Sequence, residues 1–197
     1  ILPAKILGME SMLVLSGEGE KHKNSFHEKE KPDYIVFIKD AKGENFRHKL
    51  YSEYKATRDR MPDSLRSQIG DIEEMIARMN IEIIEESWYE ADDVIATLAE
   101  KLKRENNNEI YILSGDKDLY ALVDEQVKIY DTQKKKISGP EETFEKFWVK
   151  AECVRDYLAI CGDTSDNIPG ISWIWPKKAQ VLLNEFWNLE NIYKIID

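Results

Sequence analysis

Residues 81–118 read IEIIEESWYEADDVIATLAEKLKRENNNEIYILSGDKD and alternate between two kinds of pattern. Ile81–Ile84 and Ile110–Leu113 are short runs of apolar and β-branched residues, which are typical of strands. Between them, apolar side chains recur at helical spacing over Glu90–Lys103. A strand, a helix and a second strand in this order predict a βαβ unit and a parallel sheet.

The same alternation continues on both sides of this unit. Two further strands are expected at Tyr34–Ile38 and Val127–Tyr130, and a long helix at Asp63–Asn80, which follows Pro62. The apolar run Ile1–Leu15 is compatible with a helix. Residues 1–138 are therefore expected to form an α/β core in which helices flank a mostly parallel central sheet.

Beyond residue 138 the sequence predicts only helices and turns. We expect a small, all-helical module over residues 139–197, separate from the α/β core. Its helices are expected at Glu141–Phe147, Ala151–Cys161, Pro176–Glu185 and Leu189–Ile196.

The composition of the 197 residues excludes several classes of protein. Hydrophobic residues make up 42% and charged residues 34%, which argues against disorder. No apolar run approaches the roughly 18 residues of a membrane span, so no membrane partner is expected. Cys153 and Cys161 form no cluster with histidine, which argues against zinc or disulfides and favours a cytoplasmic protein. The net charge of −10 argues, taken alone, against a nucleic-acid partner.

Acidic residues follow the expected strands and begin the expected helices. Because ligands bind at the carboxyl ends of parallel strands, these carboxylates are expected to converge. Oxygen ligands without histidine or cysteine favour Mg²⁺ or Mn²⁺, and two such ions can hydrolyse a phosphodiester. Any one of these acids alone is more often a helix cap or a solvated charge. The candidate metal ligands are Asp40, Glu90, Asp92, Asp93, Asp116, Asp118, Asp163 and Asp166.

Basic and aromatic residues alternate between Phe46 and Arg58. On a helix, Tyr51, Lys55 and Arg58 would lie on adjacent rows of one face. For this segment alone, a solvated helix face is the better interpretation. Beside a metal-binding edge, contact with nucleic-acid phosphates becomes the better one.

Seven segments together resemble the 5′-nuclease family, which includes the 5′→3′ exonuclease domain of bacterial DNA polymerase I and the flap endonucleases. They follow the family order from about residue 31 to the end, and two of them, Tyr-Glu-Ala-Asp-Asp and Gly-Asp-x-Ser-Asp-Asn-x-Pro-Gly, are highly specific in combination. The segments are Lys31-Pro32-Asp33-Tyr34, Asp40-Ala41-Lys42-Gly43, Phe46-Arg47-His48, Tyr54-Lys55-Ala56, Tyr89-Glu90-Ala91-Asp92-Asp93, Gly115-Asp116-Lys117-Asp118-Leu119 and Gly162-Asp163-Thr164-Ser165-Asp166-Asn167-Ile168-Pro169-Gly170.

The resemblance implies a PIN-like nuclease core that hydrolyses branched or nicked DNA with two Mg²⁺ or Mn²⁺ ions. It implies that Lys55 and Arg58 are the catalytic basic residues near the scissile phosphate. The first ion would be held by Asp40, Glu90, Asp92 and Asp93, and the second held or ordered by Asp116, Asp118, Asp163 and Asp166.

Gly170–Ala179 resembles the helix–hairpin–helix element of the family, whose backbone amides grip a duplex phosphate. Lys177 and Lys178 would lie at the helix start, where anions bind readily. The expected substrate is DNA with a free 5′ end, such as a flap, a nick or a displaced primer. The residues expected to contact DNA are Arg47, Tyr51, Lys55, Arg58, Gly170, Lys177 and Lys178.

The sequence also departs from the family pattern. The first strand of the family, with a further metal-binding Asp, is expected to precede residue 1. Residues 16–30 resemble an insertion or a disrupted segment where the family has a plain helix. An alternative function is therefore a truncated fragment that binds branched DNA without cleaving it. The resemblance also implies a monomer at the bacterial nucleoid and a polymerase domain that can follow in the full-length protein.

Two other enzyme classes fit the sequence less well. A phosphatase that uses the Asp116/Asp118 pair would need an Asp nucleophile in an Asp-x-Asp motif on an early strand, and the sequence has none there. A related ribonuclease-type nuclease with a similar core would not predict the element at Gly162–Ala179.

The five tryptophans fall where relatives usually carry glycine, and the nine glycines are fewer than the usual fraction of about 7%. One interpretation is that they are genuine aromatic residues, which fill the core or stack on bases. The other is that UGA codons, which the source organism reads as glycine, were rendered as tryptophan. The positions are Trp88, Trp148, Trp173, Trp175 and Trp187.

Overall fold

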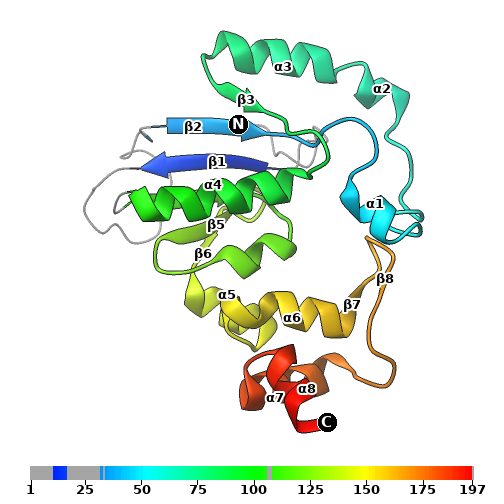
Figure 1. Ribbon diagram of the computed structural model, residues 1–197. Coiled ribbons are helices and arrows are strands. Elements are labelled where there is room, and N and C mark those ends of the chain that lie inside the picture. The colour runs from blue at the N-terminus through cyan, green and yellow to red at the C-terminus, as the bar shows by residue number, and fades with distance from the viewer. Residues whose placement is uncertain (1–10, 17–31, 33, 106–107, 197) are drawn as a thin grey trace.

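The computed structural model describes residues 11–16, 32, 34–105 and 108–196. In this part of the chain, a six-stranded sheet has the strand order β3-β2-β1-β4-β5-β6 (Figure 1). The expected strands at 34–38, 81–84, 110–113 and 127–130 are confirmed to within one residue. The strands are β1 (Ser11–Ser16), β2 (Tyr34–Ile38), β3 (Glu82–Ile84), β4 (Glu109–Leu113), β5 (Val127–Asp131) and β6 (Lys136–Ser138).

Four of the six strands share one direction. β2 pairs with β3 in parallel, and β4 pairs with β5 in parallel. β1 lies between β2 and β4 and is antiparallel to both, with Leu13 opposite Val36 and Ile112. β6 is antiparallel to β5. The mostly parallel sheet therefore carries two reversed strands, one of them at its centre.

The expectation of a helix over Ile1–Leu15 is wrong for residues 11–15, which lie in β1. The backbone of β1 is hydrogen-bonded to β2 on one side and to β4 on the other. A short apolar run alone does not reveal such pairing with distant strands. Residues 1–10 and most of the predicted insertion at 16–30 lie outside the described residues.

Alternate residues of the strands face opposite layers. Ile38 and Ile112 point into the main core, where they meet Ile95 of α4 (Ala91–Glu105). Phe37, next to Ile38, packs on the other face against Ile72 of α3 (Ile69–Arg78). The sheet is thus covered on both faces, as expected for an α/β protein.

The helix expected at Asp63–Asn80 is instead two helices, α2 (Asp63–Arg66) and α3. The break lies at Ser67 and Gln68, whose side chains donate hydrogen bonds to the carbonyl oxygen of Ser64 at 3.1 and 2.6 Å. Such side-chain bonds compete with the helical backbone pattern.

The C-terminal part is helical and continues the core of the sheet. Val154 and Leu183, from two of its helices, belong to the same buried cluster as Ile112. None of the described helices is long and apolar enough to cross a membrane. The elements are η2, a 3₁₀ helix (Asp118–Leu122), α5 (Pro140–Phe147), α6 (Ala151–Cys161), α7 (Pro176–Phe186) and α8 (Leu189–Ile196).

One feature departs from the expected all-helical module. Two short strands, β7 (Gly162–Asp163) and β8 (Ile168–Pro169), pair antiparallel after α6. Gly162 has a φ of +79°, and a Cβ on Gly170 would lie 2.4 Å from the carbonyl oxygen of Cys161. Both positions therefore need glycine for this close backbone approach.

Candidate active site

Carboxylates gather at the edge where β2 and β4 end. These two strands run in the same direction, so the residues that follow them lie on the same edge of the sheet. The loop after β2 is tied to α4 because Ala91 donates its backbone N–H to Oδ1 of Asp40 at 2.6 Å. Asp116 and Asp118 follow β4 on this edge.

Asp92 lies among the other acids. Burial, and then the charges of Asp116, Asp40, Asp118 and Glu90, raise the pKa of Asp92 to about 7. Carboxylates this close repel one another unless a cation or a proton neutralises them. The predicted convergence of the residues after β2, before α4 and after β4 is therefore present in the folded chain.

A second group joins the α/β core to the helical module. Asp118, Asp163 and Asp166 each bring one carboxylate oxygen to within 4.8 Å of the others. Oδ1 of Asp118 is buried and has no hydrogen-bond partner among the described residues. Burial, followed by the charge of Asp116, raises the pKa of Asp118 to about 6.

These donors suit a divalent cation. A buried carboxylate oxygen without a partner costs free energy that a bound cation would remove. The surrounding ligand atoms are hard oxygens, without histidine or cysteine, and this set fits Mg²⁺ or Mn²⁺.

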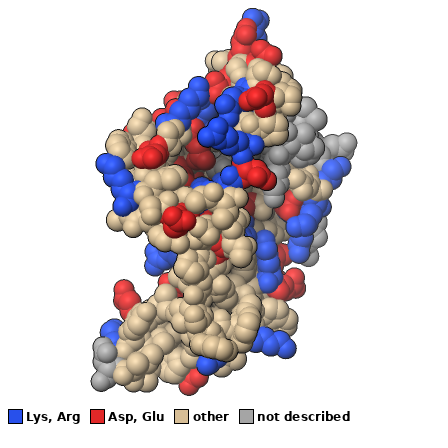
Figure 2. All heavy atoms as spheres, turned by 90° about the vertical axis from the view of Figure 1, so that its right-hand side faces the viewer, with Lys and Arg blue, Asp and Glu red and all other residues tan. Residues whose placement is uncertain are grey.

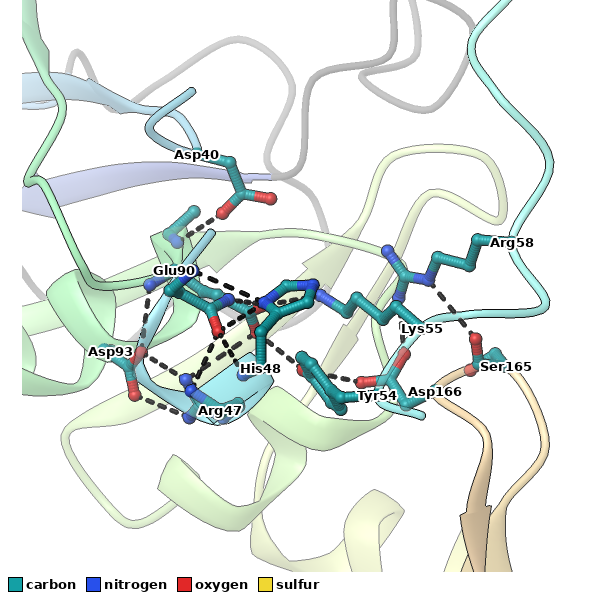
Figure 3. Close-up of polar contacts among 12 residues, drawn as sticks. Asp40, Arg47, His48, Tyr54, Lys55, Arg58, Glu90, Asp93, Ser165 and Asp166 are labelled. Atoms are coloured by element: carbon teal, nitrogen blue, oxygen red, sulfur yellow. Dashed lines mark hydrogen bonds and ion pairs between the residues drawn. The ribbon is translucent and has the colours of Figure 1, made fainter. Parts of the chain in front are cut away.

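Glu90 accepts hydrogen bonds from three different side chains (Figure 3). Its side chain is only about 10% exposed. Oε1 accepts hydrogen bonds from Lys55 Nζ at 2.7 Å and from Asn45 Nδ2 at 2.6 Å. Oε2 lies 2.8 Å from the hydroxyl of Tyr54, which also lies 3.0 Å from Oδ2 of Asp166. Tyr54 thus connects an acid of the core with an acid of the module.

Asp93 differs from its neighbours because both of its carboxylate oxygens are held by Arg47. The two guanidinium contacts measure 2.6 and 2.7 Å, and the backbone N–H of Glu90 donates to Asp93 Oδ2 at 3.0 Å. Burial opposes ionisation of Asp93, but the Arg47 and Glu90 contacts outweigh it and lower the pKa of Asp93. Arg47, expected to contact DNA, is here engaged with an acid.

The segment that carries Lys55 and Arg58 is not the helix that we expected. Helix α1 (Phe46–Leu50) ends before it, and residues 52–57 form successive turns. Lys55 has a left-handed φ of 55° and donates its backbone N–H to the carbonyl oxygen of Asp166 at 3.0 Å. Tyr51 donates its backbone N–H to the carbonyl oxygen of Arg47 and accepts the N–H of Tyr54. The turns bring Lys55 and Arg58 to the acids, and no described hydrogen bond joins Tyr51 to them.

Asp163 and Asp166 are each paired with a cation. Lys117 Nζ lies 2.9 Å from Oδ2 of Asp163, whose Oδ1 also accepts two hydrogen bonds from Ser165. Burial opposes ionisation of Asp163, but these contacts outweigh it and lower its pKa. Arg58 pairs with Oδ1 of Asp166 at 2.6 Å.

Three residues of this site were missed by the sequence analysis: Asn45, Tyr54 and Lys117. Asn45 is the N-cap of α1 and accepts hydrogen bonds from two helical N–H groups. An Asn before a short helix is a recognisable capping signal, but nothing in the sequence indicates that the same side chain reaches Glu90. Tyr54 and Lys117 lie inside segments that resemble the family, directly beside residues that we assigned.

The other residues expected to contact DNA lie between β8 and the first turn of α7. Gly170 lies after β8, and Lys177 and Lys178 are exposed in the first turn of α7. Neither lysine forms an ion pair with another residue in the described ranges. Basic and acidic side chains intermix over the core on the face shown in Figure 2, whereas the helical module below is mainly uncharged there.

Comparison with known proteins identifies the family. The description "5'-3' exonuclease, N-terminal resolvase-like domain" matches residues 21–148. The chain belongs to the 5′-3′ exonuclease family. The description of the C-terminal SAM fold of the same family matches residues 149–197. The resemblance inferred from the seven segments is thereby confirmed.

Two relatives illustrate the similarity to this family. A 5′-3′ exonuclease of Aquifex aeolicus is 40% identical over 170 residues, a match that covers 86% of this chain and 58% of the relative. A DNA polymerase I of Caldicellulosiruptor bescii is 42% identical over 176 residues, covering 86% of this chain and 21% of the relative. The chain therefore spans only part of each relative.

Solved structures support the fold of this family member. The T5 5′-exonuclease with bound divalent zinc ions superposes with a TM-score of 0.69 at 22% identity. The match covers 81% of this chain and 62% of the other. The expected PIN-like α/β core with a C-terminal helical module is confirmed.

Proposed function

We propose that this chain is a metal-dependent 5′→3′ exonuclease and structure-specific flap endonuclease that hydrolyses branched or nicked DNA. One observation carries the proposal: acids from the α/β core and from the helical module meet beside the unpartnered Oδ1 of Asp118. Membership of a family whose relatives are named 5′-3′ exonuclease supports it.

The carboxylates form two adjoining groups, which fits two Mg²⁺ or Mn²⁺ ions. When bound, such ions would activate a water molecule and stabilise the leaving oxygen of a phosphodiester. Asp93 is held by Arg47 and accepts the backbone N–H of Glu90. It thereby fixes the position of Glu90 in the first group. The first group is Asp40, Glu90, Asp92 and Asp93, and the second is Asp116, Asp118, Asp163 and Asp166.

The basic residues of the site bind and orient the scissile phosphate. Lys55 and Arg58 now neutralise Glu90 and Asp166, so their charges lie directly beside the proposed ion sites. Phosphate oxygens are natural partners for a lysine ammonium and an arginine guanidinium. Tyr54 and Asn45 keep Glu90 in place by hydrogen bonding to both of its oxygens.

Duplex DNA is bound at a distance from the chemistry. Gly170 precedes α7, and Lys177 and Lys178 lie in its first turn, where the positive end of the helix dipole and two positive charges favour a phosphate. Arg47, which pairs with Asp93, and Tyr51 are further proposed contacts to DNA from the α/β core. The proposed substrate is DNA with a free 5′ end, bound by a monomer in the bacterial cytoplasm. Its DNA polymerase I relatives indicate that a polymerase domain can belong to the full-length protein.

Cleavage of a 5′-labelled flap duplex tests the proposal. We expect the chain to release the flap in Mg²⁺ or Mn²⁺ and to lose this activity in EDTA. Asp116→Ala should abolish cleavage, whereas Glu74→Ala, which removes an exposed acid paired with Arg78, should not. Binding of the flap without metal-dependent cleavage by the unaltered chain would favour the non-cleaving fragment instead.

A further inference from the structure

Four of the five tryptophans adopt a backbone conformation that tryptophan disfavours. Their φ angles are 75° at Trp88, 58° at Trp148, 69° at Trp173 and 72° at Trp187. Left-handed φ values are uncommon outside glycine and are true outliers for bulky side chains. Of the eight non-glycine residues with positive φ in the described ranges, half are tryptophan, although the chain has only five tryptophans.

Two of these tryptophans end helices in the way that glycine usually does. Trp148 follows α5 and donates its backbone N–H to the carbonyl oxygen of Phe144 at 2.7 Å. Trp187 follows α7 and donates to Leu183 at 2.9 Å. Trp148, at φ 58° and ψ 22°, has the left-handed helical conformation that closes many helices and is usually taken by glycine. Trp187, at φ 72° and ψ −41°, lies outside that conformation, but its positive φ is strained for any residue with a Cβ.

The indole rings contribute little to the core. The five side chains are between 49% and 85% exposed, with Trp173 the most exposed, whereas tryptophan is highly buried on average. Lys49 lies 4.2 Å from the ring centre of Trp88, and Lys150 lies 4.2 Å from that of Trp187. Genuine tryptophans could use these cation–π contacts, but such contacts are weak at exposed sites.

We propose that the functional protein carries glycine at all five positions, because its gene has UGA codons that the source organism translates as glycine. The positive φ angles at residues 88, 148, 173 and 187 favour glycine. The exposed side chains at these positions give no packing reason for tryptophan. Trp175 has an ordinary φ of −81°, and it joins the set through its 72% exposure in the same loop as Trp173. This inference holds whether or not the chain cleaves DNA.

The substitution would change the loop before α7. Trp173 and Trp175 precede Pro176 and the two lysines, and their side chains are 85% and 72% exposed. Glycine at both positions would let a ligand phosphate approach the backbone N–H groups closely. Trp173→Gly with Trp175→Gly is therefore expected to tighten duplex binding several-fold, and an unchanged or weaker affinity would argue that both tryptophans are native.

The coding DNA and the mass of the native protein test the inference directly. We expect UGA at all five codons, and tryptic peptides from the source organism whose masses contain glycine at these positions. A UGG codon at any of the four left-handed positions, or a native peptide with tryptophan there, would overturn the inference.

The stability of variants of the full chain gives a test that needs no source organism. Trp148→Gly and Trp187→Gly should each raise the melting temperature, whereas Trp148→Ala and Trp187→Ala should not, because alanine keeps the strained Cβ. Trp175→Gly is the matched control at an ordinary φ and should give no such rise. A lower melting temperature in both Trp148→Gly and Trp187→Gly would contradict the proposal.

Discussion

Arg58 and Asp166, which are 108 residues apart in the chain, form an ion pair with an NH2–Oδ1 distance of 2.6 Å. The backbone of Asp166 is held as well, because its carbonyl oxygen accepts the N–H of Lys55. A turn of the α/β core therefore binds the β7–β8 loop of the helical module through an ion pair and a backbone hydrogen bond. This contact places the acids of the module against those of the core.

Arg58→Ala should weaken this contact and remove a proposed phosphate contact. The Asp166 side chain is only 13% exposed, so the loss leaves a largely buried carboxylate without its cation. We expect single-turnover cleavage to fall roughly tenfold to a hundredfold, or about 1.4–2.7 kcal/mol. Arg58→Lys should retain more activity than Arg58→Ala, and Arg78→Ala should leave cleavage unchanged. Equal activity in Arg58→Ala and the unaltered chain would contradict the role of Arg58.

Divalent cations should stabilise the folded chain. A ligand that binds only the native state at about 100 times its Kd adds roughly 2.7 kcal/mol. We therefore expect Mg²⁺ or Mn²⁺ to raise the melting temperature by several degrees, and EDTA to reverse the effect. Asp118→Asn should reduce this response because it removes one charge from the cluster of three acids. A cation response of the same size in Asp118→Asn would place the ions elsewhere.

The stability of the metal-free chain should fall as the pH rises. The pKa of Asp92 is raised to about 7 and that of Asp118 to about 6, so the folded chain holds protons that the unfolded chain releases near pH 4. The stabilisation is complete below about pH 4 and is lost as the pH rises through about 7. We expect a loss on the order of 1–2 kcal/mol between about pH 5 and 8.

Urea unfolding in EDTA measures this pH dependence. The midpoint should be lower at about pH 8 than at about pH 5, and Asp92→Asn should remove much of the difference. Asp93 and Asp163 act in the opposite sense, since their lowered pKa values give stability that is lost on acidification below about pH 4. A midpoint that rises steadily from pH 5 to 8 in EDTA would contradict the repulsion among the acids.

Duplex binding should depend on salt and on the start of α7. The net charge is −10, so attraction to DNA must come from local basic groups. Lys177→Ala with Lys178→Ala should weaken duplex binding and reduce the slope of log K against log salt by about 2. Lys101→Ala, a change on the exposed side of α4, serves as the control. An unchanged slope of log K against log salt in the double variant would show that the start of α7 does not contact DNA phosphates.

The sequence predicted most elements because their patterns are local. The strands that contain Ile38 and Ile112 are confirmed, and so is the helix that contains Ile95, because each shows the period of its structure. β1 could not be recognised, since its place between β2 and β4 depends on pairing with distant strands. The single helix expected at 63–80 is wrong for a local reason, because the side chains of Ser67 and Gln68 donate hydrogen bonds to the backbone of Ser64 and interrupt the helix.

The sequence predicts the acidic residues of the candidate site better than the basic side chains that pair with them. Asp40, Asp92 and Asp118 follow strands or begin helices, and this position alone brings them to one edge. The pairing of Arg47 with Asp93 and of Lys117 with Asp163 depends on side-chain geometry in space. No spacing along the chain encodes these contacts.

Single-turnover cleavage of a 5′ flap by Asp166→Asn tests the central claim most directly, which is that the module completes the active site of the core. Asp166 lies outside the α/β core, yet its carboxylate lies within 4.8 Å of that of Asp118. We predict that Asp166→Asn binds the flap but cleaves it at least a hundredfold more slowly in Mg²⁺, a loss of about 2.7 kcal/mol or more. Cleavage at the rate of the unaltered chain would contradict the account.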